Sequence, residues 1–171
     1  MNALRPHKLL INPARGTVPV KIHNGELITT YRDKDQQYPH TGVATLRYDP
    51  TLNTKYNDWW LISDTDEGIT DYYRRQIEQW LGIVLLKPAF GAHISIIVGE
   101  EPPNKHLWKL DQGRPVEYQY THDVFTNGEF WWLNVISPEM DAIREYFGLP
   151  EKQHQLHLTI GRMNKTEMRL L

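Results

Sequence analysis

The chain contains no cysteine among its 171 residues. This absence excludes disulfide bonds, cysteine nucleophiles and zinc sites built from thiolates. Long apolar runs are also missing, because the stretches 9–11 and 83–86 are far shorter than the ~20 residues of a membrane-spanning helix. The formal net charge of −2 is too small for a protein that binds nucleic acid through bulk positive charge. These absences predict a soluble, cytoplasmic protein that does not associate with membranes.

Apolar residues make up 40% of the chain, which includes six Trp and nine Tyr, so a folded domain with a real core is expected. We predict one domain over residues 1–171. Residues 1–42 form an N-terminal extension with a hairpin, in which segments 18–23 and 26–31 flank the turn signal Asn24-Gly25. Residues 43–163 form a duplicated core.

The most informative pattern is a four-residue motif that occurs twice, as His93-Ile94-Ser95-Ile96 and as His157-Leu158-Thr159-Ile160. Successive side chains of a strand point to opposite faces. Each motif therefore presents an imidazole and a hydroxyl about 7 Å apart on one face, with apolar residues on the other. One such motif is typical of an ordinary half-buried strand. Two that face each other would supply two proton-transfer groups and two hydroxyl donors, which suits a phosphodiester.

Strand and helix signals repeat around the two motifs. One helix is predicted after Thr65-Asp66-Glu67, with Asp64 and Glu67 as a capping pair and Gly82 at its end. Its expected apolar face is Ile69, Tyr73, Ile77, Trp80 and Leu81. A second helix is predicted with Ser137 as N-cap, Pro138 at its first position and Gly148 past its end. Strands are predicted over residues 45–48, 59–62, 93–98, 117–125, 130–136 and 157–160.

The order of these elements indicates an internal duplication. Trp59-Trp60-Leu61-Ile62, a helix and the first motif form one half, and Trp131-Trp132-Leu133-Asn134, a helix and the second motif form the other. Two lobes related by a pseudo-two-fold axis would bring the two motifs together across a cleft.

These motifs resemble those of the two-histidine phosphoesterase superfamily, which includes RNA 2′,3′-cyclic phosphodiesterases and phage or viral enzymes that degrade cyclic oligonucleotides. Gly99-Glu100-Glu101-Pro102 after the first motif and Gly161-Arg162 after the second are further local similarities. The resemblance implies an α+β, bilobal fold of two pseudo-symmetric lobes, each a small antiparallel sheet with outer helices, around a central cleft. It also implies metal-independent phosphodiesterase activity, without a cofactor, on RNA 2′,3′-cyclic phosphate ends or on cyclic or 2′,5′-linked signalling oligonucleotides.

For such a reaction we expect one of His93 and His157 to act as general base and the other as general acid. Ser95 and Thr159 would donate hydrogen bonds to the non-bridging phosphate oxygens. The sequence leaves open which imidazole is the base. Arg162 and Lys105 are the predicted substrate-binding residues, although each also suits an exposed surface position. The expected partner is a nucleotide or short RNA, with no obligate protein partner.

Other interpretations remain open. The scaffold suits a non-catalytic RNA-binding or nucleotide-binding module, or a structural protein whose repeat is coincidental. Asp64, Asp66 and Glu67 have the chemistry of an acidic metal site, but helix starts attract the same residue types. His154 and His157 resemble a metal pair, yet a three-residue offset on a strand would point them to opposite faces. The Trp pairs offer base-stacking surfaces, although core packing explains at least one ring of each pair.

Overall fold

A computed structural model describes residues 20–23, 26–29, 37–50 and 58–164 of the chain. The elements in chain order are β1 Val20–His23, β2 Glu26–Thr29, β3 His40–Tyr48, β4 Trp60–Asp64, α1 Glu67–Leu81, β5 Leu85–Leu86, β6 His93–Val98, the 3₁₀ helix η3 Lys105–Leu107, β7 Pro115–Thr126, β8 Phe130–Ile136, α2 Pro138–Tyr146 and β9 His157–Met163. The fold is mixed α+β, as the sequence predicts at this level.

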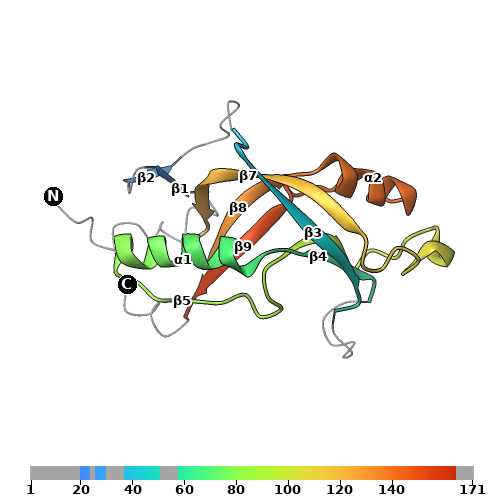
Figure 1. Cartoon of the computed structure of the whole chain (residues 1–171), viewed down its shortest axis with the longest axis horizontal. Coiled ribbons are helices and arrows are strands. Elements are labelled where there is room, and N and C mark those ends of the chain that lie inside the picture. The colour runs from blue at the N-terminus through green and yellow to red at the C-terminus, as the bar shows by residue number, and fades with distance from the viewer. Residues whose placement is uncertain (1–19, 24–25, 30–36, 51–57, 165–171) are drawn as a thin grey trace.

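All strand pairs among the described residues are antiparallel and belong to one sheet (Figure 1). The hydrogen-bonded path runs β7-β3-β4-β6-β9, and β8 joins β9 back to β7. The sheet therefore closes into a barrel-like arrangement. Two seams complete the closure: β3 and β7 pair over several consecutive residues, whereas β6 and β9 pair only at Ile94 and Leu158.

The duplication predicted from the sequence corresponds to two successive β-β-α-β units. The first is β3-β4-α1-β6, with the short β5 inserted, and the second is β7-β8-α2-β9. Asp64 lies opposite His93, and Asn134 lies opposite His157. Asp64 is thus the structural counterpart of Asn134. The two Trp-Trp-Leu sequences therefore do not occupy equivalent positions in the two units, because they differ by two residues in register.

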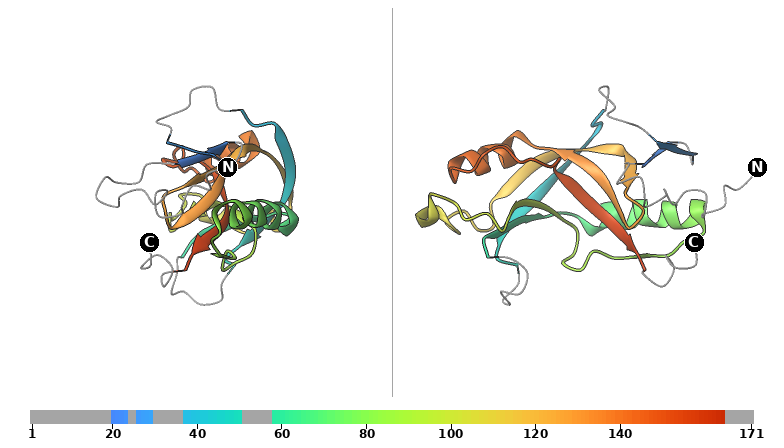
Figure 2. Two further views of the ribbon diagram at one scale, coloured as in Figure 1. Left: turned by 90° about the vertical axis from the view of Figure 1, so that its left-hand side faces the viewer. Right: turned by 180° about the vertical axis from the view of Figure 1, so that it is seen from behind.

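The helices begin and end at the predicted signals. Asp66, and not Asp64, is the N-cap of α1, since its side chain accepts a hydrogen bond from the N–H of Gly68 at 2.8 Å. Gly82 ends this helix in the left-handed region, at φ 65°. Ser137 caps α2 through the N–H of Met140 at 3.2 Å. The helices lie at opposite ends of the strand array (Figure 2), where α1 contacts β9 and α2 contacts β6 and β7. Each helix therefore packs against the motif-bearing strand of the other unit.

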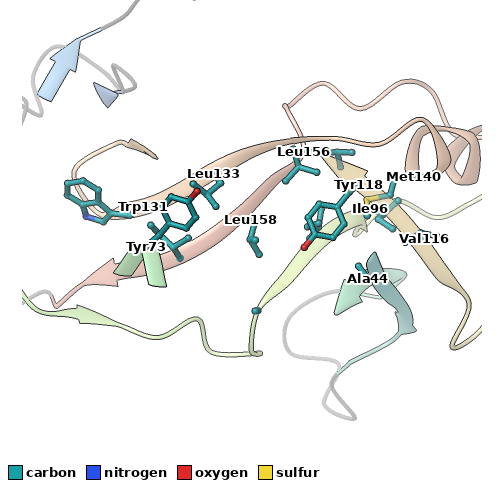
Figure 3. Packing of buried hydrophobic residues seen from close by; sticks show 14 of the residues in the cluster. Ala44, Tyr73, Ile96, Val116, Tyr118, Trp131, Leu133, Met140, Leu156 and Leu158 are labelled. Carbon is teal, nitrogen blue, oxygen red and sulfur yellow. The ribbon is translucent and has the colours of Figure 1, made fainter. Parts of the chain in front are cut away.

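The core draws on both units. Its members include Tyr73 of α1, Met140 of α2 and, at paired positions of β8 and β9, Leu133 and Leu158 (Figure 3). This apolar cluster is therefore continuous across the two units.

Several predicted details are wrong. Trp80 is 46% exposed, although Tyr73, roughly 20° away around the axis of α1, is buried. The first core strand begins at His40, within the predicted extension, and β1 pairs with β7, so the hairpin belongs to the main sheet. The β1–β2 pairing itself is confirmed, while residues 18–19, 24–25 and 30–31 lie outside the described residues.

Candidate active site

The two motifs occupy neighbouring antiparallel strands. Ile94 of β6 pairs with Leu158 of β9, and both side chains are fully buried. The flanking motif residues are partly exposed, so they share the opposite, open face. Antiparallel direction places His93 beside Thr159, and Ser95 beside His157. The four polar side chains thus form one compact patch.

The two imidazoles stand on a diagonal of this patch. Diagonal neighbours on an antiparallel pair are about 7–8 Å apart, and their Cβ atoms are somewhat closer. One phosphate group fits between two rings at this spacing, since each ring nitrogen needs about 2.8 Å to an oxygen.

Each motif contains a β-bulge at its fourth residue. The β4–β6 register shifts between Leu61 and Ile62, which leaves Ile96 unpaired, and the β8–β9 register shifts between Trp131 and Trp132, which leaves Ile160 unpaired. Beyond a bulge, the alternation of side chains between the two faces of the sheet is shifted by one residue. The residue three positions after Thr159, Arg162, is therefore exposed and lies on the same face as the motif.

Backbone carbonyls orient both rings in the same way. Nδ1 of His93 lies 2.9 Å from the carbonyl oxygen of Gly91, and Nδ1 of His157 lies 3.0 Å from that of Gln155. A carbonyl oxygen only accepts, so Nδ1 carries the proton in each neutral ring. Nε2 is left with its lone pair, ready to accept a proton.

Aromatic rings flank each imidazole. Trp60 lies edge-on to His93 with centroids 6.2 Å apart, and Trp132 lies similarly against His157 at 6.3 Å. Trp60 and Trp131 are buried, whereas Trp59 and Trp132 are half-buried. One ring of each pair is thus packed inside, as predicted. Trp132 is the partly accessible ring beside a motif histidine, and its indole N–H donates to Asn134 at 3.0 Å.

The two imidazoles have different charged surroundings. Burial lowers the pKa of His93, while the carbonyl of Gly91 and the carboxylate of Asp64 raise it and Arg47 lowers it. Arg47 and Asp64 form a two-pronged ion pair at 2.7 and 2.8 Å. Burial also lowers the pKa of His157, and the Gln155 carbonyl opposes that effect. The charged neighbours that act on His157 are Lys152, His93 and His154, and all three lower its pKa further.

Within the part of the chain that the structure describes, the hydroxyls of Ser95 and Thr159 have no hydrogen-bond partner, and both residues are partly exposed. The carbonyl oxygen of Ser95 accepts a hydrogen bond from the Lys152 ammonium. Lys152 is a site residue that the sequence analysis did not identify, because nothing marks one lysine in a loop before a strand as a neighbour of a distant motif.

Lys105 lies elsewhere. It begins η3, beyond the end of β6, and pairs with Glu101. Among the described residues, its ion-pair partner is Glu101 and no residue of either motif. His154 lies in the loop before β9 and not on the strand, so the opposite-face argument for it was wrong, and its charge acts on His157.

The described residues include no group of three or more His, Asp or Glu side chains able to hold a metal ion. Asp66 serves as a helix cap and Asp64 pairs with Arg47, which accounts for two members of the acidic trio. Within the same residues, every helix is too short or too polar to cross a membrane.

Comparison with family models, with curated proteins and with solved structures gives no match to this chain.

Proposed function

We propose that this protein is a metal-independent phosphodiesterase of the two-histidine phosphoesterase kind, acting on nucleotide phosphodiesters or cyclic phosphates. One observation carries the proposal: two His-x-Ser/Thr motifs share the open face of adjacent strands, with both Nδ1 atoms bound to carbonyls, and the described residues supply no partner for either Nε2 atom. The two successive β-β-α-β units match the internal duplication that the proposal assumes, and their strands belong to one barrel-like sheet.

In the proposed reaction the phosphorus atom lies between the imidazoles of His93 and His157. One Nε2 removes a proton from the attacking oxygen, and the other ring, protonated, donates a proton to the leaving oxygen. Each transfer typically contributes about 10² to 10⁴-fold in rate. The attacking oxygen is water for a 2′,3′-cyclic phosphate. For a 3′,5′-linkage it is the neighbouring ribose 2′-hydroxyl, which forms a cyclic phosphate first.

The other polar residues on this face, Ser95, Thr159 and Arg162, bind the phosphate groups of the substrate in the proposed reaction. Ser95 and Thr159 donate their hydroxyl hydrogens to the non-bridging oxygens and fix the phosphorus between the rings. Arg162 lies about 10 Å along β9 from Thr159. Its long side chain can cover part of this distance. It is therefore placed to pair with a neighbouring phosphate of an oligonucleotide.

The test is a substrate panel with matched histidine variants. The purified chain is incubated with nucleoside 2′,3′-cyclic phosphates, cyclic dinucleotides, 2′,5′-oligoadenylate and short RNA, and the products are resolved by chromatography. We expect turnover in EDTA. His93→Ala and His157→Ala should each lose about 10² to 10⁴-fold in kcat, whereas the exposed His106→Ala should retain activity.

Two outcomes would contradict the proposal. Turnover that EDTA abolishes and a divalent metal restores would show metal chemistry. Binding of a panel member that survives both His→Ala changes, without product, would show a nucleotide-binding module instead.

A further inference from the structure

Lys152 reaches the first motif from the second unit. It lies in the loop between α2 and β9, and its ammonium donates a hydrogen bond to the carbonyl oxygen of Ser95 on β6. The ladder between β6 and β9 consists of the single pair Ile94–Leu158. Ser95 is the next residue along β6, so the ammonium binds this strand where its backbone pairing to β9 ends.

The ammonium is largely withdrawn from water. Burial, together with the nearby charge of Arg144, lowers the pKa of Lys152 to about 8, while the carboxylate of Glu100 opposes the shift. This value lies above the ordinary histidine value of about 6.5. Lys152 therefore stays mostly cationic over the pH range in which a neighbouring imidazole titrates.

This cation makes the two halves of the site unequal. The cationic groups that act on His157 alone are Lys152 and His154, and each disfavours the imidazolium form, while the repulsion between His157 and His93 acts on both rings. The charged groups that act on His93 alone are Asp64, which favours that form, and Arg47, which opposes it. Lys152 acts on His157 and is not among the groups that act on His93.

We propose that Lys152 is a positioning residue that ties the two motif strands together and holds His157 in its neutral, proton-accepting form. This inference rests on the proposed phosphodiesterase function, and it assigns the two roles that the sequence leaves open. His157 is the general base, whose Nε2 takes the proton from the attacking oxygen. His93, beside the Asp64 carboxylate, is the general acid.

The test begins with the imidazoles and needs no substrate. Histidine titrations followed by NMR are compared in the wild type and in Lys152→Met, Lys152→Gln and Lys152→Arg. We expect the pKa of His157 to rise in the Met and Gln variants, which lack the charge, and to stay low in the Arg variant. The pKa of His93 should move less. Lys109→Met, an exposed lysine paired with Asp49, is the matched control and should move neither.

Kinetics on the substrate that the panel identifies give the second measurement. Lys152→Met should reduce kcat by about 10²-fold, as expected when reacting groups are misplaced by about 1 Å. The acidic limb of its pH profile should move to higher pH, while Lys152→Arg keeps the wild-type limb. Lys152→Gln retains a hydrogen-bond donor, so it should show the shifted limb with a smaller loss of kcat.

The results separate two kinds of failure. An unchanged His157 titration in both uncharged variants, or equal shifts of both imidazoles, would overturn the role of Lys152 whatever the protein does. A shifted His157 without turnover of any panel member would instead refute the phosphodiesterase function, and with it the assignment of base and acid.

Discussion

Replacing Arg144 by methionine tests how the first motif strand is held. Arg144 is 2% exposed and comes from α2. It donates to the carbonyl oxygen of Ile96 at 2.9 Å and to that of Pro150 at 2.8 and 3.1 Å. It also forms a two-pronged ion pair with Glu100 at 2.7 and 2.8 Å. Ile96 is the bulged residue of the first motif, so this guanidinium binds the strand at its irregular point.

The expected loss of stability follows from these contacts. Removing one partner of a buried ion pair costs about 3–5 kcal/mol, and each buried carbonyl left without a donor costs about 1–3 kcal/mol. Methionine fills much of the vacated volume, and Glu100 is 39% exposed and regains water. We therefore expect Arg144→Met to lose about 3 kcal/mol, a large share of the roughly 5–15 kcal/mol of an ordinary domain.

Urea unfolding followed by tryptophan fluorescence measures this loss. Arg75→Met is the matched control, because Arg75 is an exposed residue of a helix and should change stability by less than about 0.5 kcal/mol. If Arg144→Met does not fold, Glu100→Gln removes the charge but keeps an acceptor and should lose about 1 kcal/mol. A loss below about 1 kcal/mol in Arg144→Met, with an unchanged m-value, would refute the reasoning.

Two further predictions concern pH and close packing. Because the pKa values of His93 and His157 are lowered in the folded chain, the unfolded chain binds their protons more tightly, and stability is full above about pH 6.5 and decreases below it. The Tm of a variant with both His93→Asn and His157→Asn should therefore decrease less than that of the wild type between roughly pH 7 and 5.5. Equal decreases in Tm would contradict this. Gly42→Ala should destabilise by about 1–3 kcal/mol, because its Cβ would lie 2.4 Å from the ring of Tyr118, which is 2% exposed. Exposed Thr41→Ala is its control in the same denaturation assay, and equal stability of the two variants would show that the ring moves freely.

Local patterns were sufficient to predict the faces of the motif strands. His93 and Ser95 are partly exposed while Ile94 and Ile96 are buried, as alternation requires. The helix ends were predictable for the same reason, since caps such as Ser137 and Gly82 act within a few residues of themselves.

Contacts between distant segments were not predictable in the same way. The bulges at Ile96 and Ile160 arise from how β4 and β8 pair with the motif strands. The sequence of one strand alone does not determine its register with a partner strand. The sequence could not show that the two Trp-Trp-Leu sequences differ by two residues in register. A shift of two residues along a strand leaves every side chain on the same face. Lys152 was missed because its partner is the backbone of Ser95, and a backbone carbonyl has no residue-specific signature.

The weakness of the motif seam explains why such contacts matter. β3 and β7 close the barrel through six paired positions, whereas β6 and β9 meet at one. Backbone hydrogen bonds to β9 therefore do little to fix β6. Two cations of the second unit take that role: Lys152 binds the carbonyl of Ser95, and Arg144 binds that of Ile96. The spacing of the two imidazoles thus depends on side chains that lie outside both motifs, and intact motifs alone do not ensure an intact site.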